Sequence, residues 1–236
     1  MKTTIRGVLA LATSLTLIGC ATTGSQPTPT DTSMSTEAVH NLCLEGEMQS
    51  PIDLGTAQTR ALMPVSVHYQ EAHILPTFDQ PRLVMQVRDG GHISLYGKRY
   101  TLDAIHTTVP AEHTHRQRRE AGEMQFLHRS SDGEIAVVAL PLSEGEDNPL
   151  LAAAQAVNSE SDAIRIDLAQ LLSGEYGYYA YTGSLSMPPC TEGVRWVVLQ
   201  QASSLSEAQK EWLAEQFPIA TRPTQDVGSR GVFVSQ

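Results

Sequence analysis

The chain is short of positive charge. Its 236 residues include 16 Lys and Arg against 26 Asp and Glu, which gives a formal net charge of −10. Proteins that bind nucleic acid neutralise phosphates with clustered Lys and Arg. The acidic balance therefore argues against a nucleic-acid partner, and beyond that it indicates only a soluble surface.

The chain also lacks a long apolar run. Residues 8–18 are its most apolar stretch, but they include two threonines and a serine and are shorter than the roughly 20 residues that a transmembrane helix needs. Lys2 and Arg6 precede this stretch, and Leu17-Ile18-Gly19-Cys20 ends it. The pattern is typical of a bacterial lipoprotein signal over residues 1–19, with Cys20 carrying the lipid (a palmitate-type modification). Loss of the two basic residues with the signal would take the net charge from −10 to −12.

A linker is expected after the lipidated cysteine. Residues 21–36 are rich in Thr, Ser, Gly and Pro, without apolar periodicity, and a random coil of that length spans on the order of 20–25 Å. We therefore expect a tether over residues 20–40 and one domain over residues 41–236. Alanine rather than aspartate at position 21 favours the outer membrane. The expected location is the cell envelope, with the lipid anchor in the outer membrane and the domain facing the periplasm.

Cysteine is scarce as well. With Cys20 assigned to lipid, only Cys43 and Cys190 remain of the three cysteines. The envelope outside the inner membrane is oxidising, so an even pair there favours a disulfide. Two buried free thiols are the alternative.

Hydrophobic patterning predicts a mainly β (α+β) domain with a few short helices. Strands are expected over residues 82–87, 92–96, 100–109, 122–129, 134–142 and 193–200. A helix is expected over residues 147–157, where Pro149 takes an early position. A second helix begins at Ser206 with a capping box to Gln209, and Pro218 ends it.

Three separated motifs carry a resemblance to a known family. They are Gln49-Ser50-Pro51-Ile52-Asp53-Leu54, Ile105-His106-Thr107-Thr108-Val109-Pro110-Ala111-Glu112-His113-Thr114, and Gly183-Ser184-Leu185-Ser186-Met187-Pro188-Pro189-Cys190-Thr191-Glu192-Gly193-Val194-Arg195-Trp196. Together they resemble the bacterial type of α-carbonic anhydrase. The resemblance runs from about residue 42 to about residue 235. It implies a central, twisted, mostly antiparallel sheet with short peripheral helices, and zinc-dependent hydration of CO2 to bicarbonate.

The resemblance also shows which metal ligands are missing. His106 stands at the first of the family's three zinc-ligand positions, but Thr108 and Gln125 stand at the second and third. A hydroxyl and an amide are not ordinary zinc ligands beside an imidazole. We therefore expect no zinc cofactor. Instead, Thr108 and Gln125 would fill the cavity with hydrogen bonds to each other, to His106 and to Glu123.

Other histidines are poor replacements as ligands. The family's residue at the position of His113 is a structural, buried histidine. His128 is three residues from Gln125, so on a regular strand it faces the other way. His115 shares the parity of His113, and a relocated site including it is the remaining option.

The remaining family positions are filled. Ser186 matches the threonine that orients the zinc hydroxide, Glu112 its carboxylate partner, and His92 the proton shuttle. The family's CO2 pocket corresponds to Leu127, Val137, Leu185 and Trp196, and its bacterial disulfide corresponds to Cys43 with Cys190.

Two functions follow as hypotheses. The first is a zinc-free, non-catalytic envelope lipoprotein that acts as a binding or structural module, with an envelope protein or a small ligand in its cleft as partner. The alternative is a zinc-dependent carbonic anhydrase with an atypical or weak metal site built on His106. A third possibility, another hydrolytic or lyase activity in the cleft, has no support beyond the pocket.

Overall fold

The computed structural model describes residues 42–157, 163–172, 176–218 and 221–236. The predicted signal, the lipidation at Cys20 and the tether lie outside the described residues. Within them, no helix is long and apolar enough to cross a membrane.

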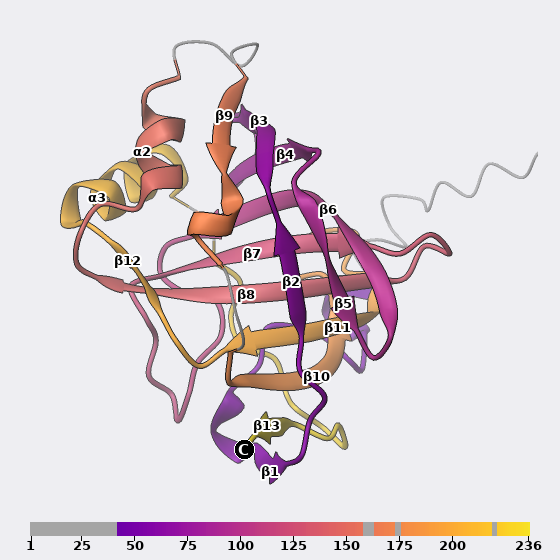
Figure 1. Cartoon of the computed structure of the whole chain (residues 1–236). Helices are drawn as coiled ribbons and strands as arrows, with labels where there is room; N and C mark the ends of the chain where they lie inside the picture. The colour runs from indigo at the N-terminus through magenta and orange to yellow at the C-terminus, as the bar shows by residue number, and fades with distance from the viewer. Residues whose placement is uncertain (1–41, 158–162, 173–175, 219–220) are drawn as a thin grey trace, which may run out of the picture. The chain divides into compact units, whose positions relative to one another are not determined.

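Strands dominate the described chain (Figure 1). The strands are β1 (Gln58–Arg60), β2 (Ser66–Tyr69), β3 (Glu71–Thr77), β4 (Leu83–Arg88), β5 (Gly91–Leu95), β6 (Lys98–Thr108), β7 (Gly122–Arg129), β8 (Ile135–Glu144), β9 (Ile164–Asp167), β10 (Tyr178–Ser184), β11 (Glu192–Leu199), β12 (Ser203–Leu205) and β13 (Phe233–Ser235). The helices are α2 (Pro149–Gln155) and α3 (Glu207–Gln216), with single 3-10 turns η1 (Leu54–Thr56) and η2 (Leu168–Gln170).

The strands form one sheet whose main path runs β1-β13-β10-β11-β8-β7-β6-β4-β3-β9. Off this path, β12 pairs with β8, β5 pairs with β6, and β2 pairs with β5. Among the described pairings only β1 with β13, β11 with β8 and β12 with β8 are parallel. The sheet is therefore mostly antiparallel, which confirms the expected fold class. The predicted strands all form within a few residues of the expected bounds.

The central strands are buried on both faces. Along β8, Val138 and Leu140 join the larger apolar cluster, while Val137 and Ala139 join a smaller one with Trp196. This division follows from the period of two in a strand. The smaller cluster marks the face of the sheet on which the candidate site lies.

The two helices support each other at one end of the sheet (Figure 1). Asn148 caps α2, and Ser206 caps α3 through the predicted capping box with Gln209. The Gln209 side chain also accepts from the Asn148 backbone N–H at 2.8 Å and donates to its carbonyl at 2.9 Å. This reciprocal pair fixes the start of α2 against the start of α3.

Candidate functional site

The pairing of β6 with β7 brings together the three positions that correspond to the family's zinc ligands. His106 lies opposite Gln125, and Thr108 lies two residues further along β6, opposite Glu123. His106 and Thr108 share a face of their strand because side chains alternate. Thr108 is fully buried, and its hydroxyl has no hydrogen-bond partner among the described residues. The expected hydrogen bonds of Thr108 are therefore not made.

A buried arginine that no sequence motif indicated lies at this site. Arg82 directly precedes β4, whose Val84 pairs with His106. Its guanidinium donates to both oxygens of Glu112, from Nη2 to Oε1 at 2.9 Å and from Nη1 to Oε2 at 3.3 Å. Nη1 also donates to Ser186 Oγ at 3.1 Å. Arg82 is 4 % exposed and Glu112 is fully buried, so this is an ion pair inside the protein.

Gln125 completes a continuous network around this ion pair. Its Nε2 donates to Glu112 Oε2 at 2.7 Å and to Glu123 Oε1 at 2.8 Å. Its Oε1 accepts from Ser186 Oγ at 3.3 Å. The expected contact between Gln125 and Glu123 is confirmed. An amide suits this position because it can donate to two carboxylates and still accept from a hydroxyl.

His113 is a structural residue, as the resemblance implied. Its Nδ1 contacts Glu123 Oε1 at 3.0 Å, and its Nε2 contacts the Tyr181 hydroxyl at 2.7 Å. Burial opposes ionisation of Glu123, but the proximity of His113 and hydrogen bonds from His113 and Gln125 outweigh it and hold the pKa of Glu123 below its usual value. Both ring nitrogens of His113 are thus occupied.

Burial also lowers the pKa values of two further histidines, His106 and His128. The pKa of His106 falls to about 4, first because of burial and then because of the positive charge of Arg82. Burial lowers the pKa of His128 to about 3; its ring contacts the Tyr69 hydroxyl at 2.8 Å. Both imidazoles are therefore neutral at neutral pH, and His128 is used within the core.

The donor set does not fit a zinc ion. It offers one neutral imidazole with a hydroxyl and an amide, and the amide oxygen already accepts a hydrogen bond. The Arg82 guanidinium, whose positive charge helps to lower the pKa of His106, would repel a divalent metal. Throughout the described residues, no group of three or more His, Cys, Asp or Glu side chains is placed to hold a metal.

A small cavity of about 130 Å³ opens beside this network. Its polar lining consists of His106, Gln125 and Ser186. Its apolar wall contains the four positions expected for the CO2 pocket, Leu127, Val137, Leu185 and Trp196, together with Met187 and Pro188. The structure thus brings these predicted residues together.

His92 is not part of this cavity. It lies on β5 opposite His68 of β2, and the two rings stack with centroids 4.7 Å apart. It is absent from the residues that line the cavity. The register of β5 with β6 places His92 opposite Thr101, and its assignment to the family's shuttle position stays a prediction.

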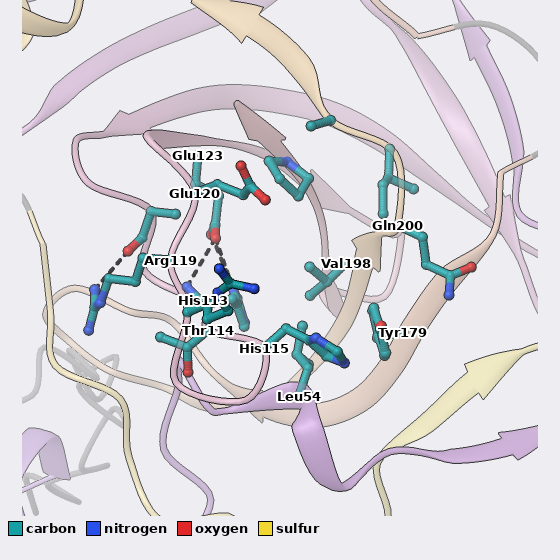
Figure 2. A pocket seen from close by; sticks show the side chains of 15 residues that line it. Leu54, His113, Thr114, His115, Arg119, Glu120, Glu123, Tyr179, Val198 and Gln200 are labelled. Atoms are coloured by element: carbon teal, nitrogen blue, oxygen red, sulfur yellow. Dashed lines mark hydrogen bonds and ion pairs between the residues drawn. The ribbon is translucent and has the colours of Figure 1, made fainter. Parts of the chain in front are cut away.

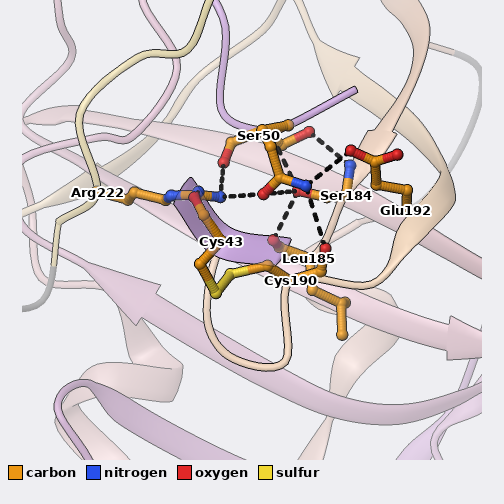
Figure 3. The surroundings of a disulfide bond; sticks show 8 residues. Cys43, Ser50, Ser184, Leu185, Cys190, Glu192 and Arg222 are labelled. Carbon is orange, nitrogen blue, oxygen red and sulfur yellow. Dashed lines mark hydrogen bonds between the residues drawn. A yellow bond between two sulfur atoms is a disulfide. The ribbon is translucent and has the colours of Figure 1, made fainter. Parts of the chain in front are cut away.

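The expected disulfide between Cys43 and Cys190 is present, with Cα atoms 5.2 Å apart (Figure 3). Arg222 lies beside it. Its guanidinium donates to the carbonyls of Cys43 and Ser50 and to Gln49 Oε1, while its backbone N–H donates to Glu112 Oε1 at 2.9 Å. Arg222 therefore connects the disulfide region to the buried carboxylate of the site.

Comparisons with known proteins agree with this architecture. The sequence model of the family described as eukaryotic-type carbonic anhydrase matches residues 33–236. A carbonic anhydrase from a Nostoc species is 28 % identical over 209 residues, covering 81 % of this chain and 77 % of that protein.

Two solved structures are similar over most of their length. A hyperthermostable carbonic anhydrase from a hydrothermal vent chimney superposes with a TM-score of 0.76 at 28 % identity, covering 84 % of this chain and 92 % of that one. Dioscorin complexed with ascorbate gives a TM-score of 0.76 at 28 % identity, covering 83 % and 89 %. On the family match and this shared fold, the chain belongs to the α-carbonic anhydrase family.

Proposed function

We propose that this chain is a zinc-free, non-catalytic member of its family that acts as a binding module. One observation carries the proposal: the Arg82 guanidinium is bound to both Glu112 and Ser186 beside His106. An arginine keeps its positive charge at any physiological pH. It supplies a fixed cation at the site, and no exchangeable metal is needed to balance Glu112.

The groups that the family uses in catalysis are engaged elsewhere in this chain. Ser186 Oγ accepts from Arg82 and donates to Gln125, and both Glu112 oxygens accept hydrogen bonds. A zinc enzyme lowers the pKa of a bound water to about 7 to form hydroxide. Neither a neutral imidazole nor an amide can do so. The network instead resembles a buried polar core in which Arg82, Glu112, Ser186 and Gln125 are hydrogen-bonded to one another.

The remaining cavity supports binding of a small molecule. An apolar cavity of about 150 Å³ is large enough for benzene, and the cavity here is of similar size, about 130 Å³. Its polar end offers His106, Gln125 and Ser186. A ligand with an apolar body and one polar group fits this lining. The structure of dioscorin with ascorbate supports the idea that a chain of this fold holds a small organic molecule.

The setting that we propose is the cell envelope. The lipoprotein signal at Lys2, Arg6 and Leu17-Ile18-Gly19-Cys20 supports an anchor in the outer membrane, and the disulfide of Cys43 with Cys190 is consistent with an oxidising compartment. The partner is then an envelope protein or a small molecule in the cavity.

Stopped-flow CO2 hydration by the full chain, with zinc in excess, tests the absence of catalysis. We expect no rate above the uncatalysed background. An inhibitor-sensitive rate that disappears in His106→Ala would contradict the proposal and favour the alternative, a zinc carbonic anhydrase with an atypical site, which the retained His106, Ser186 and Glu112 support.

A further inference from the structure

A second cavity, of about 480 Å³, lies apart from the site described above. The two cavities share no lining residue. The larger one is bounded on one side by the segment His115-Arg116-Gln117-Arg118-Arg119, here called the arginine turn, and on another side by β10 and β11. An inference about it therefore stands independently of the proposed function.

The arginine turn is unusual in this acidic chain. It places three arginines within four residues of a protein that has 16 basic and 26 acidic residues. All three side chains are exposed. In the described part of the chain, no salt bridge involves any of them, whereas Arg129, Arg165 and Arg195 are each paired with a carboxylate. Their charge is free to attract an anion.

The turn is held in a fixed shape. The backbones of His115 and Arg118 exchange two hydrogen bonds, at 2.9 and 3.1 Å, and the two residues between them have φ of 51° and 64°. Residues other than glycine rarely adopt this conformation. The Asp53 carboxylate supports it by accepting from the backbone N–H groups of Arg116 and Gln117 and from the Thr114 hydroxyl. Burial opposes ionisation of Asp53, but these donors and Gly55 outweigh it and lower its pKa, so the support persists at neutral pH.

The walls of the cavity differ in chemistry. Arg118 and Arg119 both line it, and one amino group of Arg119 is already bonded to the Ala111 carbonyl.

Figure 2 shows Glu120 and Glu123 on one side of the cavity and His115, Tyr179 and Gln200 across from them. The rings of His115 and Tyr179 are 5.8 Å apart. Both Glu123 oxygens are occupied by His113 and Gln125, whereas one oxygen of Glu120 accepts from Ser143 and the other has no partner among the described residues.

We propose that this cavity binds a phosphate monoester of a sugar. Two guanidinium groups favour an anion with a charge close to −2, and a phosphate monoester carries about −1.5 to −2 at pH 7. The planar guanidinium fork matches phosphate oxygens. The second oxygen of Glu120 can accept hydrogen bonds from sugar hydroxyls, and the Gln200 amide can donate or accept them. The tilted rings of His115 and Tyr179 add aromatic surface. The phosphate lies at the arginine turn, against Arg118 and Arg119.

Isothermal titration of the full chain with glucose 6-phosphate, glucose and inorganic phosphate tests this proposal. We expect glucose 6-phosphate to bind, inorganic phosphate to bind more weakly, and glucose not to bind. Arg118→Gln should weaken binding about tenfold or more, which equals about 1.4 kcal/mol. Its melting temperature should match the wild type, since the Arg118 side chain has no partner among the described residues.

Arg116→Gln is the matched control. It removes the same charge from the same turn, but Arg116 lines a neighbouring cavity and not this one. It should weaken binding much less than Arg118→Gln. Glu120→Gln should weaken the binding of glucose 6-phosphate but not the binding of inorganic phosphate. An equal loss of affinity in Arg118→Gln and Arg116→Gln would mean that only the general positive charge of the turn matters, and it would overturn the proposal. The absence of binding to either phosphate compound would also overturn it.

Flotation with phosphatidylglycerol vesicles distinguishes the source of the phosphate. Binding to vesicles that depends on Arg118 more than on Arg116, with no binding of glucose 6-phosphate, would assign the site to a lipid headgroup and would refute the sugar. Binding of glucose 6-phosphate without vesicle binding would support the soluble phosphorylated sugar.

Discussion

The guanidinium of Arg82 binds both carboxylate oxygens of Glu112 inside the protein, at 2.9 and 3.3 Å. A bidentate pair of this kind fixes the orientation of both groups. Because Ser186 and Gln125 are bonded to the same pair, the position of the arginine determines the chemistry of the whole site. Glu112 stands at the position of the family's carboxylate, and the side chain of Arg82 provides the positive charge that balances it.

Loss of the buried ion pair should destabilise the fold. Arg82→Gln leaves Glu112 buried without its cation, and removal of one partner of a buried pair typically costs about 3–5 kcal/mol. Urea unfolding measures the change. Arg165→Gln is the control, because Arg165 pairs with Glu71 on the surface, where both side chains are largely exposed. Equal unfolding free energies for the two variants would show that the buried pair has no special role.

Motif spacing predicted the fold and most of the site, but it did not predict Arg82. The alternation of buried residues and the capping signals of Pro149 and Ser206 are local, so they can be read from sequence. Arg82 reaches Glu112 across 30 positions, a contact that only the sheet pairing creates. The one available signal was a charged residue at the start of the apolar run Leu83-Val84-Met85 facing a carboxylate that needed a partner. The stacking of His92 on His68 was also out of reach of motif spacing, since it depends on the pairing of β5 with β2.

Rebuilding the metal site should require removal of the arginine. Thr108→His with Gln125→His provides three imidazoles, but Arg82 still places a positive charge beside them. We expect little zinc in this double variant and clear zinc binding after the addition of Arg82→Gln. Zinc per chain, measured after dialysis, gives the answer. Equal zinc in the double and triple variants would show that the guanidinium does not oppose the metal.

Stability should fall when the pH drops below about 6.5. Unfolded histidine has a pKa near 6.5, whereas that of His106 is about 4 and that of His128 is about 3 in the folded chain. Between these values the unfolded state binds more protons, so each histidine costs roughly 1.4 kcal/mol of stability per pH unit as pH falls. The folded state regains the proton only below its own pKa, where this loss levels off.

His106→Gln isolates one of these contributions. The pH dependence of its unfolding free energy between about pH 6 and pH 4.5 should be shallower than that of the wild type by roughly 1.4 kcal/mol per unit. His73→Gln, which removes an imidazole at an exposed position on β3, is the matched control. Identical slopes for His106→Gln and the wild type would contradict the buried, neutral state of this imidazole.

The disulfide should contribute to stability. It links positions separated by 147 residues, and the loop-entropy model assigns a loop of that size about 4–5 kcal/mol. Cys43→Ser should therefore lower the melting temperature by several degrees. The intact mass under non-reducing conditions should be two hydrogens below that of the reduced chain. An unchanged melting temperature would show that the bridge adds no stability.

The most direct measurement is the zinc bound per chain when the wild-type protein is equilibrated with excess zinc at neutral pH and then dialysed. The arrangement of Arg82, Glu112, Ser186 and Gln125 predicts far less than one zinc per chain. One zinc per chain that is lost in His106→Ala would contradict the account, because it would mean that His106 recruits ligands despite the neighbouring guanidinium.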